Sequence, residues 1–118
     1  MLILVIDDDY GIRNLVAEIL DGEGYHVITA HDGPSGLAAA LQNLPDLVIC
    51  DERMPGLAGH EVCQQLYTNP HTSAVPVVMM SAHSYEIAQA SPNCVMRLRK
   101  PLTYDGLVTT VQDVIGVP

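Results

Sequence analysis

The sequence predicts an α/β fold in which a five-stranded parallel sheet is doubly wound, with helices on both faces. Five short apolar runs alternate along the 118 residues with segments whose apolar side chains recur at helical spacing. The runs lack the polar alternation of a half-exposed strand, as is typical of strands buried on both faces. Acidic, hydroxyl and lysine residues follow the ends of four runs. Repeated strand and helix units of this kind give right-handed crossovers and a parallel sheet.

The first strand and helix occupy the start of the chain. Residues 2–6 are apolar and rich in β-branched side chains, and the run stops at a triple acid, which predicts a buried strand. An amphipathic helix follows, and Gly22 and Gly24 end it. Its apolar positions are Ile12, Leu15, Val16, Ile19 and Leu20.

The second unit begins with a strand predicted over residues 25–30. Asp32 is suited to cap the helix that follows, and Pro34 is compatible with its first turn. The apolar face of this helix is formed by Leu37, Ala40, Leu41 and Leu44.

The third unit has its strand at residues 47–50, directly before Asp51. The segment Met54-Pro55-Gly56 interrupts the chain, and the helix beyond it ends at Asn69-Pro70. The apolar face of this helix is formed by Val62, Cys63, Leu66 and Tyr67.

Two more strands are predicted over residues 75–80 and 94–99. Between them, only residues 84–91 are available for a fourth helix before Pro92, and two turns of helix are marginal without tertiary support. A last helix has its apolar stripe at Tyr104, Leu107, Val108, Val111 and Ile115.

The composition fits a single domain spanning residues 1–118, since 48% of the residues are hydrophobic and supply a core. Five Lys and Arg against 14 Asp and Glu give a formal net charge of −9, which excludes direct binding to nucleic acid or anionic membranes.

No apolar run approaches the roughly 20 residues that cross a bilayer, and no signal peptide opens the chain. We therefore expect a cytoplasmic location. The three cysteines, with no CxxC pair, are interpreted as small buried hydrophobic residues in a reducing compartment.

Reactive side chains gather where the predicted strands end. In an open parallel sheet these ends meet at one edge, and ligands bind beyond it. The residues at the four strand ends are Asp7, Asp8 and Asp9, then Asp51, Ser81 and Lys100. Lys100 is the only lysine in the chain, and its position at the same edge as the acids argues against a chance surface lysine.

The acids of this edge predict a cation site. In the flavodoxin-like strand order 2-1-3-4-5 the first and third strands are neighbours, which crowds Asp7, Asp8 and Asp51. Two like charges about 4 Å apart repel by about 4 kcal/mol at an effective dielectric of about 20, so the cluster must hold protons or bind a cation. Mg²⁺ fits, because it binds one or two carboxylates and bridges to phosphate oxygens. A solvated acidic helix start explains Asp9 but not Asp51.

A carboxylate nucleophile, a divalent cation, a hydroxyl and an ammonium are the groups that phosphoryl transfer needs, and an aspartyl phosphate is the expected product. The segments IDDD, CDERMPG, MMSAH and RKP, in that order, resemble the receiver domain of two-component response regulators, the CheY-like family. The resemblance covers essentially the whole chain. It implies a (βα)5 fold with strand order 2-1-3-4-5.

The resemblance implies that Asp51 is the phosphate acceptor. The Mg²⁺ ligands that it implies are Asp7, Asp8, Asp51 and the backbone carbonyl of Arg53. Arg53 and His83 also lie at the family positions that tune dephosphorylation, because they flank the attacking water.

Three further groups have roles that the resemblance implies. Ser81 is the switch hydroxyl that turns toward the phosphoryl group, Lys100 contacts a phosphoryl oxygen, and Ala82 contributes a backbone amide. A cis peptide bond between Lys100 and Pro101 is also typical of the family.

The sequence departs from the family pattern near its fifth strand. Arg97 stands where the family usually has Tyr or Phe, so the usual aromatic switch cannot operate. Arg97, Arg99 and Lys100 form a basic spot suited to an acidic partner, although solvated edge-strand arginines that discourage aggregation explain it equally well. The stretch from Ser81 to Lys100 is shorter than usual, and the loss falls on the fourth helix. This predicts an atypical output surface.

The remaining histidines do not indicate a metal site. They are His26, His31, His60 and His71. His60 and Cys63 have helical i, i+3 spacing, but nothing completes a tetrahedral ligand set, so core or surface histidines are expected.

The leading hypothesis is a phosphorelay receiver, a regulatory switch that catalyses its own phosphorylation and slow dephosphorylation. A histidine kinase or histidine phosphotransfer protein would phosphorylate Asp51 with Mg²⁺, contacting the first helix near Arg13 and the loop that begins at Arg53. Ser81 and Lys100 would then change the face formed by the fourth helix, fifth strand and last helix. A downstream protein or fused effector domain would bind that face, with the chain a monomer or a phosphorylation-dependent dimer.

Two alternatives belong to other functional classes. The first is an atypical receiver that acts as a protein-binding module without phosphorylation. The second is a small haloacid dehalogenase-like phosphatase with Asp7 as nucleophile and Asp9 as acid. Against the phosphatase, 118 residues leave no room for a cap domain, and the motif around Asp51 has no role in it.

Overall fold

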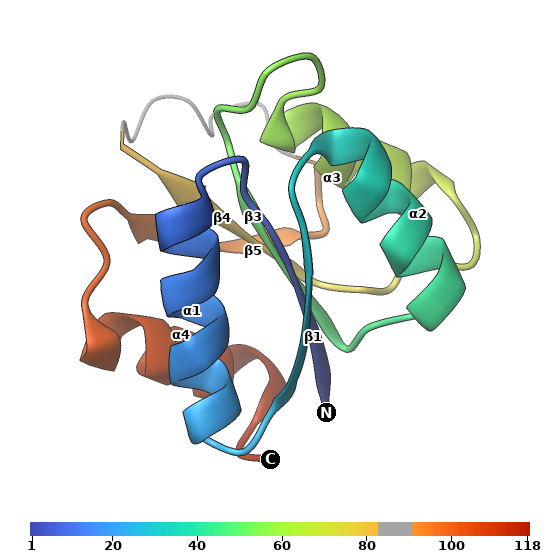
Figure 1. Ribbon diagram of the computed structural model, residues 1–118. Helices are drawn as coiled ribbons and strands as arrows, with labels where there is room; N and C mark the ends of the chain where they lie inside the picture. The colour runs from blue at the N-terminus through green and yellow to red at the C-terminus, as the bar shows by residue number, and fades with distance from the viewer. Residues whose placement is uncertain (83–90) are drawn as a thin grey trace.

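A computed structural model describes residues 1–82 and 91–118 and shows a five-stranded parallel sheet between two layers of helices (Figure 1). The strand order β2-β1-β3-β4-β5 confirms the predicted order. The strands are β1 (Leu2–Ile6), β2 (His26–Ala30), β3 (Leu47–Asp51), β4 (Val77–Ser81) and β5 (Cys94–Arg99). The helices are α1 (Tyr10–Gly22), α2 (Gly33–Asn43), α3 (Gly59–Thr68) and α4 (Tyr104–Ile115). The helix predicted over residues 84–91 lies outside the described residues except for Ser91, so α4 is the helix predicted last.

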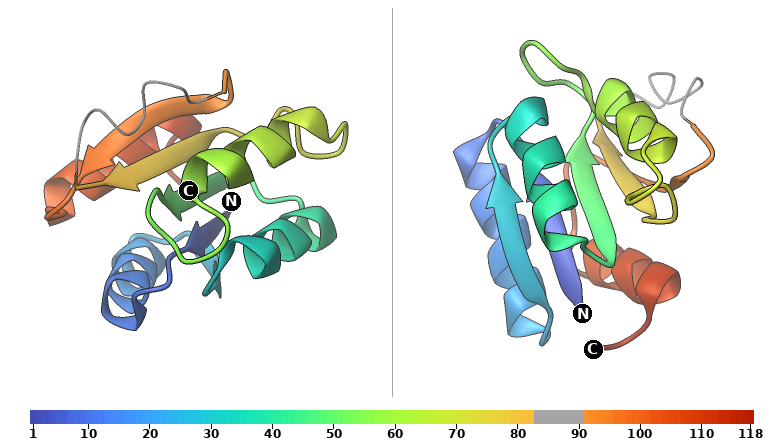
Figure 2. Two further views of the ribbon diagram at one scale, coloured as in Figure 1. Left: turned by 90° about the horizontal axis from the view of Figure 1, so that it is seen from above. Right: turned by 90° about the vertical axis from the view of Figure 1, so that its right-hand side faces the viewer.

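The two faces of the sheet bury two separate apolar cores. Helices α1 and α4 cover one face, and α2 and α3 cover the other (Figure 2). Alternate residues of the central strands point to opposite faces because the side-chain period of a strand is two. The core under α2 and α3 contains Leu4, Ile6, Val48 and Cys50, and the core under α1 and α4 contains Ile3, Val5, Leu47 and Ile49. Burial on both faces explains why these strands are continuous apolar runs.

The ends of β3 and β4 extend one residue further than the apolar pattern predicts. Asp51 lies opposite Met80 in the ladder, and Ser81 lies opposite Arg99. Both polar residues therefore belong to strands rather than to the loops that follow. Their backbones are fixed by the sheet, which gives the side chains defined positions at its edge.

The starts of β2 and β4 lie later than predicted because nearby backbone groups make turn contacts. The Tyr25 N–H donates to the Leu20 carbonyl (3.1 Å), and the Val75 N–H donates to the Thr72 carbonyl (3.1 Å). Pro76 has no N–H to donate to a ladder. The strands begin at the residues after Tyr25 and Pro76.

Strand β5 forms an irregular edge of the sheet. Cys94 lies opposite Val77 and Met96 opposite Val78, so Val95 is an extra residue in β5. Beyond the bulge, Leu98 is buried and Met96 is 38% exposed. Of the cysteines predicted to be buried, Cys50 and Cys63 are, but Cys94 is only partly buried because it begins this edge strand.

The five strands point the same way, so their carboxyl ends meet at one edge of the sheet, which runs along the top and left of Figure 1. The two chain ends lie at the opposite edge (Figure 1), where the Tyr25 hydroxyl donates to the Gly116 carbonyl (2.6 Å).

Among the helices of residues 1–82 and 91–118, none has the length and apolar character to span a membrane.

Candidate functional site

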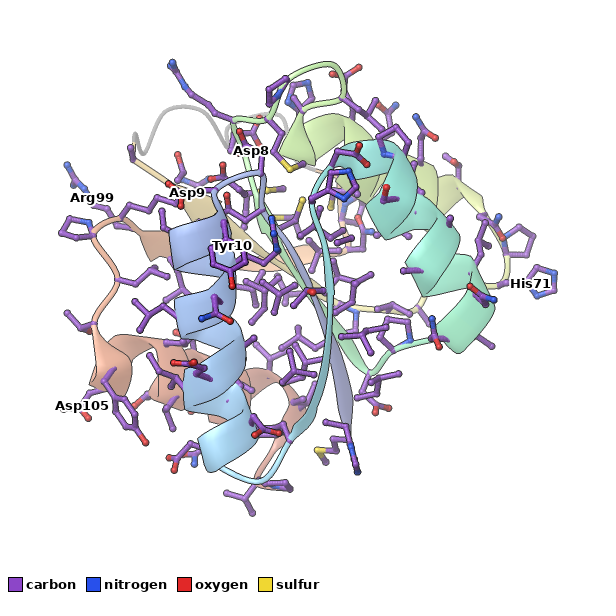
Figure 3. All side chains as sticks on the ribbon, in the orientation of Figure 1. Asp8, Asp9, Tyr10, His71, Arg99 and Asp105 are labelled. Atoms are coloured by element: carbon purple, nitrogen blue, oxygen red, sulfur yellow. The ribbon has the colours of Figure 1, made fainter. Side chains whose placement is uncertain are left out.

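The acidic and basic residues predicted at the strand ends do converge at one edge of the sheet. Asp7 and Asp8 follow β1 directly, Asp51 ends β3, and Lys100 follows β5. Figure 3 shows Asp8 and Asp9 at the turn between β1 and α1. One carboxylate oxygen from each of Asp7, Asp8 and Asp51 lies within 4.8 Å of the others. Strand β1 is next to β3, and this adjacency brings residues 44 positions apart into one cluster.

Lys100 is the cation that faces this cluster. Its Nζ lies 2.8 Å from Asp51 Oδ1 and 3.5 Å from Asp7 Oδ2. Asp7 is 0% exposed and Asp51 is 5% exposed, so both carboxylates are largely removed from water. The lysine side chain reaches across the end of β4 from the edge strand to the centre of the sheet.

Burial sets the protonation of these groups. Burial raises the pKa of Asp7 and of Asp51, and the contacts with Lys100 oppose that rise without cancelling it. Burial acts to lower the pKa of Lys100, but the hydrogen bond to Asp51 and the charge of Asp7 outweigh it, and the pKa is raised. Lys100 is therefore firmly cationic, while the carboxylates still carry an unfavourable excess of negative charge.

The residues present fit a magnesium ion. Three carboxylates face one ammonium, so the cluster keeps an excess of negative charge that a divalent cation would neutralise. Two of the carboxylates are buried and one is exposed, which leaves a side open to water. Mg²⁺ prefers oxygen ligands and retains several waters when it binds to proteins. No other group of three possible ligand residues converges within the described ranges.

The backbone around Asp7 holds its carboxylate in place. Asp7 Oδ1 accepts a hydrogen bond from the Asp9 N–H (2.9 Å), and the guanidinium of Arg13 donates to the Asp7 carbonyl (2.8 Å). Asp9 Oδ1 in turn accepts from the Ile12 N–H (3.2 Å) and caps α1. The acidic helix start therefore explains Asp9, as the sequence indicates, while Asp7 and Asp8 belong to the cluster.

Helix α3 begins in contact with the end of β3. A Cβ atom at Gly59 would collide with the Asp51 carbonyl oxygen and would lie 2.8 Å from the Glu52 Cα. The Gly59 N–H also donates to the Glu52 carbonyl (2.9 Å). The absence of a side chain at this position lets the helix approach the backbone that carries Asp51.

The other predicted site residues lie around the cluster. Ser81 is 4% exposed at the end of β4, and its carbonyl accepts from the Lys100 N–H (2.9 Å). Arg53 and Ala82 are exposed. The peptide bond before Pro101 is cis, as the resemblance implies. His83 lies outside the described residues.

The basic residues of β5 are exposed on the edge strand of the sheet. Arg97 is exposed and lies opposite Met79 in the ladder, while Arg99 lies opposite Ser81. Figure 3 shows the Arg99 side chain at the upper left of the molecule, beside the end of β5. The prediction that Arg97 and Arg99 form a basic spot is compatible with their exposure.

Sequence reasoning missed a buried acid next to Asp51. Glu52 is 5% exposed, and its Oε1 lies 2.6 Å from Nδ1 of His60 in the first turn of α3. Its Oε2 has no hydrogen-bond partner in the part of the chain that the structure describes. The pair lines a surface depression of about 620 Å³ together with Met54 and Pro55. One sequence signal could have revealed Glu52. It is an acid directly after Asp51, at the first position beyond a strand that is predicted to be buried.

Comparison with protein families identifies a match over most of the chain. The family model described as the response regulator receiver domain matches residues 3–112. PilH of Pseudomonas aeruginosa is 31% identical over 117 residues, which covers 97% of this chain and 97% of PilH. The response regulator PleD of Caulobacter vibrioides is 44% identical over 80 residues, which is 68% of this chain but only 18% of PleD.

Solved structures show the same fold. The response regulator TrrA of Thermotoga maritima, solved in complex with Mg²⁺ and BeF, superposes with a TM-score of 0.87 at 32% identity, covering 96% of this chain and 97% of TrrA. The chemotaxis protein CheY4 of Vibrio cholerae gives a TM-score of 0.86 at 29% identity, with 96% and 97% of the two chains covered. The likeness extends over nearly the full length of both solved chains.

Proposed function

Because this chain belongs to the response regulator receiver domain family, we propose that it is a phosphorelay switch whose Asp51 accepts a phosphoryl group from a histidine kinase or phosphotransfer protein. The observation that carries the proposal is the position of Asp51, which shares one site with Asp7, Asp8 and the Lys100 ammonium. Domains of this family are regulatory switches rather than enzymes with a separate substrate.

The side chains supply the groups that transfer requires. A carboxylate oxygen of Asp51 attacks phosphorus, the bond from phosphorus to the donor nitrogen breaks, and the imidazole leaves with its electron pair. Lys100 Nζ, 2.8 Å from Asp51 Oδ1, supplies positive charge where the phosphoryl oxygens arrive. Asp7, Asp8, Asp51 and the Arg53 carbonyl would hold Mg²⁺, which would supply further positive charge beside the transferred group.

The backbone next to the site connects it to the edge of the sheet. Ser81 ends β4, and its carbonyl holds the Lys100 N–H, so both residues are joined to the strand pair β4 and β5. When Asp51 carries a phosphoryl group, the Ser81 hydroxyl and the Ala82 N–H donate to its oxygens. The resulting shift alters the face that includes β5 and α4, where a downstream protein or a fused effector domain binds.

The phosphodonor approaches from the open side of the cluster. Asp8 is exposed there, and α1 and the loop that begins at Arg53 flank it. Arg13 fixes the Asp7 carbonyl on the α1 side. We therefore infer that α1 and this loop contact the kinase or phosphotransfer protein.

The geometry disfavours the phosphatase alternative. Asp7, its nucleophile, is 0% exposed, and its two oxygens contact the Asp9 N–H and the Lys100 ammonium. Asp9 caps α1 instead of facing Asp7 as an acid. The binding-module alternative keeps one supporting observation, which is the exposed Val95 and Met96 on the edge strand β5.

The test is intact-mass spectrometry after treatment with acetyl phosphate, with and without Mg²⁺. Wild-type protein should gain one phosphoryl group only with Mg²⁺, and Asp51→Asn should gain none. Asp113→Asn is the matched control, because Asp113 is an exposed acid near the end of α4, toward the opposite edge of the sheet (Figure 1), and it should behave as wild type. Equal labelling of Asp51→Asn and wild type would overturn the proposal. A complete lack of labelling in wild type would favour the binding module.

A further inference from the structure

Helix α2 keeps part of its apolar face on the surface of the molecule. The sequence pattern assigns four residues to this face, namely Leu37, Ala40, Leu41 and Leu44. Ala40 is fully buried and Leu37 packs partly against the core under α2 and α3. Leu41 and Leu44, in contrast, are 45% and 55% exposed. Half of the predicted apolar face is therefore still in contact with water.

The exposed side of α2 is uncharged as well as apolar. Pro34, Ala38 and Leu41 are all exposed, and their spacing of four and then three residues places them on one stripe along the helix. Residues 33–45 contain no Asp, Glu, Lys, Arg or His, and this is the longest such run in the chain. Helices α1, α3 and α4 each carry ionisable residues. Because the solvent side of a surface helix is normally charged or polar, this stripe is unusual for a face that stays in water.

Leu44 has a backbone conformation that disfavours its side chain. It ends α2 with φ 48° and ψ 65°, in the left-handed region that Gly or Asn usually occupies at the end of a helix. A leucine at this position is sterically strained, and its exposed side chain gains little burial within the chain. A contact with another molecule would bury it. Together with Pro34, Ala38 and Leu41, it forms the α2 face.

The charge of the chain indicates which molecule can cover the α2 face. Each copy has a formal net charge of −9, so two copies repel each other over most of their surfaces. On the α2 face they can meet without bringing like charges together, because the nearest acids in the sequence, Asp32 and Asp46, lie beyond its two ends. A basic partner would gain nothing from a face without acids. A second copy of this chain is therefore the occupant that fits.

We propose that the α2 face is the contact between two copies of this chain in a weak dimer that does not depend on phosphorylation. The two α2 helices pack antiparallel across a two-fold axis, so that the same face meets itself. Ala38 lies midway along α2, where its small side chain lets the two backbones approach. Leu41 of each copy then lies against the first turn of α2 in the other copy. The face is small, so the dimer forms only at high protein concentration.

This dimer would leave the proposed phosphoacceptor site and the β5 edge uncovered. Helix α2 packs on β1 and β2, whereas β5 is the strand at the other edge of the sheet. The right-hand view of Figure 2 shows α2 on the outer side of the molecule, facing the viewer. The contact between copies can therefore be tested separately from phosphorylation.

The experiment is sedimentation equilibrium of the full chain over a concentration series that reaches millimolar protein. Wild type should pass from monomer to dimer as the concentration rises. Leu41→Glu adds one negative charge from each copy at the contact and should remain monomeric. Leu15→Glu is the matched control, because Leu15 is 49% exposed on α1 and receives the same charge, and it should dimerise as wild type does. Added NaCl should increase the dimer fraction of wild type, because salt screens the repulsion between the two acidic copies.

A second variant separates the contact from the fold. Leu44→Asn removes the apolar side chain but keeps a residue that tolerates the left-handed conformation. Urea denaturation of dilute protein should show no loss of stability, while sedimentation equilibrium should show a weaker dimer than that of wild type.

Four results would overturn the proposal. They are a wild-type protein that stays monomeric throughout the series, a dimer that persists in both Leu41→Glu and Leu44→Asn, a monomeric Leu15→Glu protein, and a dimer fraction that falls as NaCl is added. The last result would indicate a contact between opposite charges instead of the α2 face. Asp51→Asn should dimerise as wild type does, so a failure of the phosphorelay proposal would leave this result unchanged.

Discussion

Two adjacent acids at the end of β3 have the same burial and different surroundings. Asp51 and Glu52 are each 5% exposed. Asp51 shares its site with two more carboxylates and one ammonium, so negative charge is in excess. Glu52 meets a single imidazole, that of His60, at 2.6 Å. The first arrangement has an excess of charge that a cation from outside the chain would neutralise, whereas the second is an internal link between β3 and α3. Buried charge alone therefore does not identify a functional site, and the balance of charge around it is the better indicator.

The largest expected effect comes from a change that disturbs both acids at once. Gly59→Ala places a methyl group against the Asp51 carbonyl and 2.8 Å from the Glu52 Cα, and both are backbone atoms that cannot move aside. We expect a loss of about 3 kcal/mol in unfolding free energy, measured by urea denaturation. Gly22→Ala is the matched control, because no atom lies within 4 Å of its Cβ. A Gly59→Ala protein as stable as Gly22→Ala would contradict the close contact between α3 and β3.

Magnesium should act on the Asp51 cluster alone. At a free concentration roughly 100-fold above its Kd, a ligand that binds only the folded state stabilises it by about 2.7 kcal/mol. We expect a rise in the melting temperature of wild type, a much smaller rise in Asp8→Asn, and a normal rise in His60→Ala. Asp8 is exposed, so its replacement removes a ligand without opening a cavity. An equal Mg²⁺ effect in wild type and Asp8→Asn would refute the assigned ligand set.

His60→Ala should destabilise the protein by about 2 kcal/mol, because it leaves the buried Glu52 carboxylate without its partner. The imidazole is 45% exposed, so water entering its place limits the loss. Adding Glu52→Leu to His60→Ala should recover stability, since the unpaired charge is then removed. The control is His71→Ala at the exposed position labelled in Figure 3. The free energy of unfolding of both variants is measured by urea denaturation. If His60→Ala and His71→Ala are equally stable, the bond between Glu52 and His60 does not stabilise the fold.

The smallest effect is expected for an acid that belongs to neither cluster. Asp9→Ala removes the cap of α1, where Asp9 Oδ1 accepts from the Ile12 N–H, and should cost about 1 kcal/mol. Its Mg²⁺ affinity, measured by calorimetry, should stay close to that of wild type. Asp8→Asn should show the opposite pattern, with little loss of stability and weak Mg²⁺ binding. A large loss of Mg²⁺ affinity in Asp9→Ala would place Asp9 in the cluster.

The sheet and the main site were predictable because each follows from a local pattern. Continuous apolar runs identify strands that are buried on both faces, and parallel strands bring their carboxyl ends to one edge. That logic places Asp7, Asp51 and Lys100 together without any knowledge of side-chain positions. It also predicts which acids crowd, because β1 and β3 are neighbours in this strand order.

The features that were missed depend on tertiary contacts. The bulge at Val95 is set by how β5 pairs with β4, and no residue type in that stretch signals it. The bond between Glu52 and His60 spans a loop whose path determines which side chains meet. Residue spacing along the chain contains none of this information.

The most direct test of the central claim is to locate the phosphoryl group chemically. Wild-type protein is phosphorylated with acetyl phosphate and Mg²⁺ and then reduced with borohydride, which converts an aspartyl phosphate to homoserine. Tandem mass spectrometry of the peptides identifies the converted residue. Homoserine at Asp51 alone, and only when Mg²⁺ was present, is the predicted result. Conversion at Asp7 or Asp8, or conversion at Asp51 that does not depend on Mg²⁺, would contradict the assignment of the cluster as a metal-dependent phosphoacceptor site.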